Sequence, residues 1–200
     1  MRTGTRIGVA VILTAVAAAG CTTQDPGTAS PTTSTGSATT PSVSIPPRPK
    51  TLNAASVDPC TLLSDTQIAQ LKASAGHPGP GEAQSGTTAS CTYQVNDPVH
   101  YTISARIEPK RGIDYWLTYT GTWQVRQTAV SSFPAVQIIY KGEDWNGASG
   151  TQCRTLVSIA DGQELSSGVI QTGKDLTMNQ MCDVSKQAAG LALTTLLAKS

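Results

Sequence analysis

The sequence predicts an α+β fold: an antiparallel sheet of about five strands, with the N- and C-terminal helices packed on one face and two disulfides holding them there. Three observations lead to this prediction. Segments of strand-like composition fill the middle of the chain, and segments with helical periodicity lie on either side of them. Four cysteines follow Cys21, on expected strands or near expected helix starts: Cys60, Cys91, Cys153 and Cys182.

The first expected helix carries signals of a helix start. Pro59 fits the first helical turn, where its missing N–H has no partner to lose. Ser64 with Gln67 three residues later has the spacing of a capping box. We expect this helix to end near residues 75–76 and the Gly- and Pro-rich residues 77–88 to form a loop.

The central segments have the composition of strands. In residues 101–107 apolar and polar side chains alternate, so that one face of a strand is apolar. Asp161-Gly162 between two such segments is a strong signal for a hairpin turn. The expected strands are residues 90–96, 101–107, 125–130, 135–141, 152–160 and 163–171. Residues 113–119 are apolar and fit either a helix or an irregular segment.

The last expected helix covers residues 179–198. An apolar stripe at helical spacing predicts the side that packs on the sheet. Its members are Val184, Ala188, Leu191, Thr195 and Ala198. We therefore place a single folded domain at residues 54–200, a size that supports one hydrophobic core.

Residues 1–20 have the pattern of a bacterial lipoprotein signal peptide. Two arginines near the start precede the thirteen apolar or small residues 7–19, a stretch too short to span a membrane stably. Small residues then lead to Cys21, whose thiol would take a diacylglyceryl group before cleavage. Two or more acyl chains suffice for stable anchoring. The alternative is an ordinary secretory signal followed by an incidental cysteine.

Residues 21–53 are expected to be the lipidated Cys21 followed by a disordered tether. Of the 29 residues from Thr22 to Lys50, 19 are Ser, Thr or Pro, so the segment cannot bury enough apolar surface to order itself. As a flexible coil it would span about 30 Å, and its threonines could accept O-linked sugars. These features predict a domain held on the extracytoplasmic face of a cell membrane by lipid.

The four later cysteines predict two disulfides, because an even set in an exported chain is typical of bridges. Three pairings are open, and we favour Cys60 with Cys91 and Cys153 with Cys182, since each bond then ties a terminal helix to the sheet. A metal site is the weaker alternative because the chain has no closely spaced cysteine pair.

Several motifs together resemble a known family. Asp58-Pro59-Cys60 opens the domain, Cys91 opens a strand, Cys153 lies on a late strand, and Cys182 opens an Ala-rich final helix. With the signal pattern before them, residues 56–198 resemble domain-of-unknown-function family 3558, the actinobacterial cell-envelope lipoproteins. The resemblance implies an anchored extracytoplasmic domain and brings no catalytic residues.

Composition and motifs argue against several functions. A formal net charge of +1 with 14% charged residues disfavours nucleic-acid binding. Residues 168–174 imitate a phosphate-binding loop, but Asp175 stands where a Ser or Thr must follow, so no nucleotide is expected. The histidines, His77 and His100, lie in predicted loops without a catalytic or metal-ligand pattern. We expect no catalytic residues, no metal and no cofactor.

An aromatic cluster is the best candidate contact surface. Its residues are Tyr115, Trp116, Tyr119 and Trp123, which share one face if the segment is helical. They could equally pack against the sheet as core.

These features together predict a non-enzymatic binding or accessory module of the cell envelope, anchored through Cys21. Its partner would be another envelope protein or a wall or lipid ligand. The alternative is a carrier of a lipid or small hydrophobic ligand, with a pocket lined by Trp116, Trp123, Ile138 and Leu191. A hydrolase with an unrecognised site is a third, weaker hypothesis.

Overall fold

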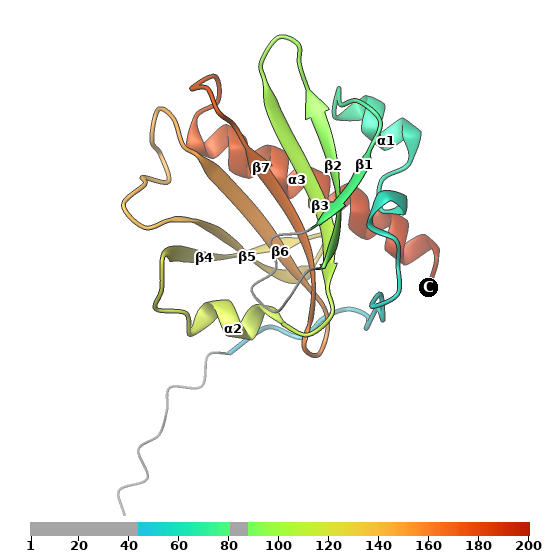
Figure 1. Ribbon diagram of the computed structural model, residues 1–200. Helices are drawn as coiled ribbons and strands as arrows, with labels where there is room; N and C mark the ends of the chain where they lie inside the picture. The colour runs from blue at the N-terminus through green and yellow to red at the C-terminus, as the bar shows by residue number, and fades with distance from the viewer. Residues whose placement is uncertain (1–43, 81–87) are drawn as a thin grey trace, which may run out of the picture. The chain divides into compact units, whose positions relative to one another are not determined.

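The computed structural model describes residues 44–80 and 88–200 and forms one curved antiparallel sheet with helices on both faces (Figure 1). The expected signal peptide at 1–20, Cys21 and most of the expected tether lie outside the described residues. The elements in chain order are a 3₁₀ turn (Pro59–Thr61), α1 (Asp65–Gln70), β1 (His77–Pro80), β2 (Ala89–Val95), β3 (Tyr101–Glu108), α2 (Ile113–Leu117), β4 (Trp123–Val130), β5 (Phe133–Tyr140), β6 (Gln152–Ala160), β7 (Gln163–Ile170) and α3 (Met178–Ala198).

The sheet has seven strands in the order β1-β2-β3-β7-β6-β5-β4, and every neighbouring pair is antiparallel. The prediction of about five strands was therefore too low. One added strand is β1, His77–Pro80, which lies in the segment predicted as a loop. Its two prolines are compatible with a strand because β1 is an edge and pairs only with β2.

The long helix α3 covers one face of the sheet and builds the main core. Along β3, Ile103, Ala105 and Ile107 point into this core, as their alternation predicts. The predicted stripe on α3 was wrong in phase: Val184 and Leu191 are only partly buried. The buried residues are Met178, Met181, Cys182, Ser185, Ala188, Ala189, Ala192, Leu193 and Leu196.

The disulfides are formed in the favoured pairing. Cys60 is bonded to Cys91 and Cys153 to Cys182, with Cα–Cα distances of 4.9 and 5.1 Å. The Cys153–Cys182 bond explains which side of α3 faces the sheet. It places the first turn of the helix with Cys182 against β6, and the residues that follow at helical spacing from Cys182 then face the sheet.

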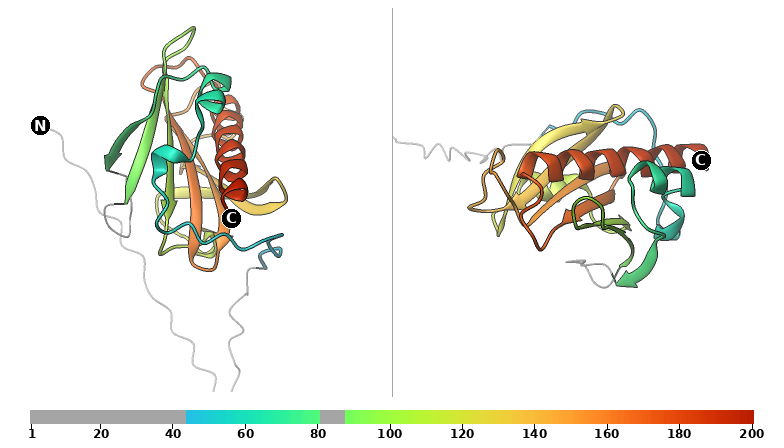
Figure 2. Two further views of the ribbon diagram at one scale, coloured as in Figure 1. Left: turned by 90° about the vertical axis from the view of Figure 1, so that its right-hand side faces the viewer. Right: turned by 90° about the horizontal axis from the view of Figure 1, so that it is seen from above.

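The short helix α1 lies on the same side of the sheet as α3 (Figure 2). The predicted capping box is present, with Ser64 Oγ accepting from the Gln67 N–H and the Gln67 side chain accepting from the Ser64 N–H. Gln67 also donates through Nε2 to the Leu191 carbonyl oxygen at 3.0 Å, which joins α1 to α3. The helix ends at Gln70, before the expected 75–76, and Lys72 has a positive φ of 53°.

Residues N-terminal to the expected domain boundary at 54 also pack on the domain. Leu52 is 2% exposed and lies in the main core, and its N–H donates to the Ile159 carbonyl oxygen at 2.7 Å. Ala54 is buried beside it. Leu52 and its backbone hydrogen bond therefore attach this stretch to β6.

Candidate functional site

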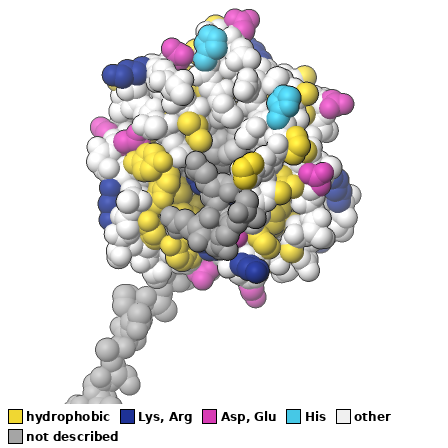
Figure 3. Space-filling model, in the orientation of Figure 1, with side chains coloured by type: hydrophobic (Ala, Val, Ile, Leu, Met, Phe, Trp, Pro, Cys, Tyr) yellow, Lys and Arg dark blue, Asp and Glu magenta, His cyan; other side chains and the backbone are white. Residues whose placement is uncertain are grey.

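The face of the sheet opposite α3 carries a second apolar cluster beneath α2 (Figure 1). The register of the strands places alternate residues of β4, β5 and β6 on this face. The buried members of the cluster are Ile113, Trp116, Trp123, Val136, Ile138 and Leu156. In the space-filling view of this face, hydrophobic side chains gather in the central part, and charged side chains lie mostly at the periphery (Figure 3).

The helix α2 is only Ile113–Leu117, so the four predicted aromatic residues do not share one helical face. Trp123 instead begins β4. The segment between them, Thr118-Tyr119-Thr120-Gly121-Thr122, favours this result, because β-branched residues and glycine are weak helix formers. The chain then turns back, and Trp116 and Trp123 meet in the same apolar cluster.

We call five aromatic residues on this face the α2 surface: Tyr115, Trp116, Tyr119, Trp123 and Tyr140. The two tryptophans are buried, whereas Tyr115 and Tyr140 are 39% and 37% exposed and are the exposed large hydrophobic side chains of the described residues. The rings of Tyr115 and Trp116 lie 5.2 Å apart, and Trp123 stacks on Tyr140 at 4.2 Å. The sequence pattern missed Tyr140, which only the cross-strand register brings opposite Trp123.

Charged residues are buried on the same face, under and beside α2. No motif or spacing in the sequence distinguishes them from surface charges. We call them the charged cluster: Arg106, Glu108, Arg111, Arg154 and Glu164, all at most 9% exposed. Buried charges are costly unless they are paired or hydrogen-bonded, so each must be accommodated by specific neighbours.

Glu164 holds α2 onto the sheet. Trp116 donates its indole N–H to Glu164 Oε2 at 2.9 Å. Burial raises the pKa of Glu164 to about 8, and the charge of Glu108 adds to the rise, whereas the indole hydrogen bond and the charges of Arg111 and Arg106 act in the opposite direction. Glu164 is therefore mostly protonated at neutral pH.

Strand register brings the two carboxyl groups together. Glu108 of β3 is the direct partner of Glu164 of β7 in the antiparallel pair. Like charges at opposed positions repel, which agrees with a protonated Glu164. Both side chains are at most 1% exposed, so a substrate in solution could not reach them without movement of the surrounding residues.

Two of the three arginines of the charged cluster, Arg111 and Arg154, lie against aromatic rings. The Arg111 guanidinium is 4.8 Å from the centre of the Tyr115 ring and 5.4 Å from that of Trp116. Arg154 is 5.6 Å from the Trp123 ring. Gly168 makes room for Arg154, since a Cβ at this position would lie 3.2 Å from Arg154 Cγ. Cation–π contacts and the packing of these two arginines thus hold the aromatic rings of the α2 surface in place.

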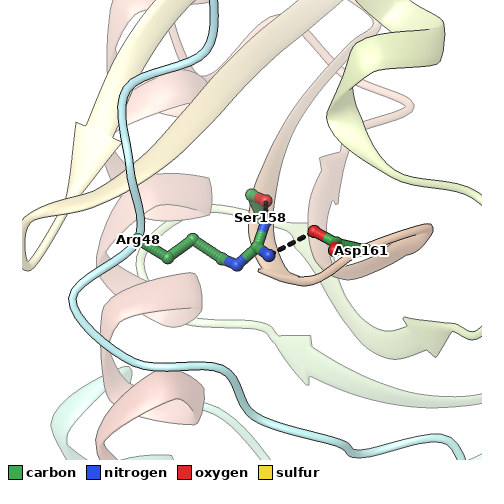
Figure 4. Close-up of polar contacts among 3 residues, drawn as sticks. All are labelled: Arg48, Ser158 and Asp161. Atoms are coloured by element: carbon green, nitrogen blue, oxygen red, sulfur yellow. Dashed lines mark hydrogen bonds and ion pairs between the residues drawn. The ribbon is translucent and has the colours of Figure 1, made fainter.

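Residues 44–52, which we call the strap, run between α2 and the β6–β7 hairpin. Ile45 packs against the apolar cluster beneath α2. Arg48 donates through Nη1 to Ser158 Oγ at 2.9 Å and forms an ion pair with Asp161 through Nη2 (Figure 4). The strap therefore fixes where the chain joins this face of the domain.

The hydrophobic anchor of the strap should matter more than its ion pair. Asp161 is 98% exposed, and pairs of this kind contribute less than about 1 kcal/mol. The hydrogen bond to Ser158 adds about 1 kcal/mol, so Arg48→Ala should lower the free energy of unfolding by no more than about 2 kcal/mol in urea denaturation. Leu52→Ala removes a buried side chain and should lower the free energy of unfolding by about 2–5 kcal/mol. Equal effects of the two substitutions would contradict this assignment.

Two hollows lie beside the strap. An open cleft of about 540 Å³ is lined by the strap, the start of α2 and the β6–β7 hairpin. A cavity of about 30 Å³ lies between α2 and the β4–β5 hairpin, among Ile45, Ile113, Leu117 and Val136. The second cavity could hold about one water molecule.

The residues expected to line a carrier pocket do not come together. Trp116, Trp123 and Ile138 lie in the cluster beneath α2, whereas Leu191 packs against the main core on the opposite face of the sheet. The sheet itself therefore separates Leu191 from the other three.

The remaining motif residues are dispersed. His77 lies on the edge strand β1, where the sequence predicted a loop, and the backbone N–H of His100 donates to Asp175 Oδ2 at 3.4 Å. Among residues 44–80 and 88–200, no three His, Cys, Asp or Glu side chains gather as metal ligands. Within the same ranges no helix has the length and apolar character needed to cross a bilayer.

Comparison with known proteins identifies one family. Residues 16–195 match the family model described as "Protein of unknown function (DUF3558)". No curated protein and no solved structure matches the chain.

Proposed function

The chain belongs to this family of unknown function, and we propose that it is a non-enzymatic binding module of the cell envelope, anchored by lipid at Cys21 and facing the extracytoplasmic side. The observation that carries the proposal is the construction of the α2 surface. Tyr115 and Tyr140 are exposed, and each contacts a buried tryptophan. Exposed aromatic rings on a rigid support are favourable contact residues, since little side-chain entropy is lost on binding.

In this proposal the charged cluster has a structural role and not a catalytic one. Glu164 is used to hold Trp116, and the arginines support the rings of the α2 surface. The two disulfides add rigidity to the same domain. Such an arrangement suits a preformed contact surface, whereas a lipid carrier would need a larger apolar cavity than the 30 Å³ space beneath α2.

The proposed lipid anchor predicts in which cell fraction the Cys21→Ser variant is found. The unchanged protein should sediment with membranes and carry the mass of an acylated Cys21. Cys21→Ser should lack this mass and leave the membrane fraction once its leader is removed, because no acyl chain then remains to hold it. Detection of the unchanged protein without acylation, in the soluble fraction, would refute the anchor.

The contact part of the proposal is tested with matched surface variants. Native mass spectrometry of the gently extracted protein should show a non-covalently bound molecule. Tyr115→Ala should lose that molecule, and Gln187→Ala, an exposed change on α3, should retain it. Equal retention by both variants would remove the α2 surface as the contact site.

A further inference from the structure

We propose that the α2 surface rests on the headgroup layer of the membrane in which Cys21 is anchored, with Tyr115 and Tyr140 at the interface. This inference depends on the anchor in the proposed function and names the partner of the same surface. The partner is a lipid bilayer surface, which fits the place where the tether joins the domain, the length of the tether and the exposed tyrosines beside that place.

The tether joins the domain beside α2. Ile45 packs in the apolar cluster beneath α2 and lines the small cavity with Ile113 and Leu117. The bonds of Arg48 to the β6–β7 hairpin then hold the next turn of the strap in place (Figure 4). The described chain begins at this position (Figure 1). An anchor upstream therefore pulls on the domain at the edge of the α2 surface.

The length of the tether keeps this side of the domain near the bilayer. Residues 22–43 separate Cys21 from Ser44, and a Ser/Thr/Pro-rich coil of that length would have an end-to-end distance of about 25 Å. A domain of this size has a radius of gyration of about 15 Å and is about 40 Å across. A coil of that average extent would hold the α2 surface within reach of the bilayer, at an effective concentration in the millimolar range.

The side chains at the α2 surface fit a headgroup layer. Tyrosine is enriched at membrane interfaces because its ring is apolar and its hydroxyl is polar. Lys110 and Arg111 precede α2, and Lys141 donates to the Thr120 carbonyl oxygen at 2.7 Å in the loop after it. Arg111 is buried beneath α2, so the cations available to a headgroup layer are Lys110 and Lys141. They are balanced by Asp114 and by Glu143, which accepts from the Tyr140 N–H, so this surface is close to neutral and its exposed tyrosines carry the contact.

The experiment uses the full, anchored chain with a photoreactive benzoyl-phenylalanine at one position. Replacement of Tyr115 tests the α2 surface, and replacement of Gln187, which is exposed on α3, is the matched control. After irradiation in native membranes, mass spectrometry separates lipid adducts from protein adducts. We expect about tenfold more lipid adduct at position 115 than at 187, which corresponds to an orientational preference of about 1.4 kcal/mol.

A second probe at Tyr140 guards against a local effect of substitution in α2, and it should give the same excess of lipid adduct. Equal lipid adducts at all three positions, or a protein adduct in place of lipid at 115 and 140, would overturn the membrane contact. Failure of the anchor looks different, because all three variants would then be found in the soluble fraction.

Discussion

Removing the Cys153–Cys182 disulfide by the double substitution Cys153→Ala and Cys182→Ala should lower the free energy of unfolding by about 4–5 kcal/mol. The chain-entropy model gives about 3–4 kcal/mol for a loop with a sequence separation of 29 residues. The rest comes from packing, because both cysteines are fully buried and the truncation leaves unfilled space in the core. Urea denaturation at a fixed pH measures the difference.

The second disulfide is a matched control for this experiment. Cys60 and Cys91 are separated by 31 residues, so the entropic contribution of their bond is nearly the same. Cys60 is only partly buried. Cys91 is fully buried, so its truncation adds some packing loss, but the double alanine variant should still lose less stability than the Cys153–Cys182 variant because only one of its two cysteines is fully buried. A larger loss for this pair than for Cys153–Cys182 would show that packing of α3 on β6 is not the deciding contribution.

The disulfide pairing was predictable from the sequence, but the side of α3 that packs on the sheet was not. Val184 and Leu191 lie on an apolar face of the helix. A second face, which includes Cys182 and Leu193, is equally apolar, so the sequence offers two faces that could pack on the sheet. Small residues such as Ala188 and Ala189 fit both faces. Only the bond to Cys153 selects between them, because it fixes the rotation of the first turn.

The charged cluster escaped prediction for a different reason. In β3, Arg106 and Glu108 alternate with apolar residues, which is the pattern of a sheet with one face in water. The short helix α2 covers part of that face, where Trp116 donates to Glu164 and Arg111 lies against Tyr115. A five-residue helix gives little periodicity to detect, and the contact between Trp116 and Glu164 joins residues 48 positions apart. The sequence pattern of one strand cannot show that a distant segment packs over its polar face.

The sequence identified four of the five aromatic residues of the α2 surface, but it did not show which of them are exposed. The four aromatic residues were identified as either core or contact surface, and their burial divides between these two outcomes. Trp116 and Trp123 are core, Tyr115 is exposed, and Tyr119 is intermediate. Tyr140 was not recognised because it lies at the end of a strand and meets Trp123 only through the β4–β5 register.

Replacing Glu164 with glutamine should change how stability depends on pH. The pKa of Glu164 is about 8 in the folded protein, against an ordinary value of 4.5, so between these pH values the native state keeps a proton that the unfolded chain releases. Stability then falls as pH rises through this window, by about 1.4 kcal/mol per pH unit, and levels off above pH 8. The amide of the glutamine variant stays neutral and should remove this slope.

The two proteins should therefore be about equally stable near pH 5, where Glu164 is protonated in the native state and its amide replacement can still accept the Trp116 hydrogen bond. At pH 9 the variant should be the more stable one, by up to about 5 kcal/mol. Urea denaturation from pH 5 to pH 9 measures the curves. Gln187→Ala, an exposed change on α3 that alters no titratable group, should leave the shape of the pH curve unchanged. Parallel curves for Glu164→Gln and the unchanged protein would contradict the raised pKa.

Glu108→Gln separates burial from charge repulsion as causes of this raised pKa. Burial is the larger cause and the charge of Glu108 the smaller one. The variant should thus retain most of the slope, but the fall in stability should end at a lower pH, because Glu164 no longer faces a carboxylate across the β3–β7 pair. If Glu108→Gln instead abolished the slope, repulsion between the two carboxylates, and not burial beneath α2, would control the protonation of Glu164.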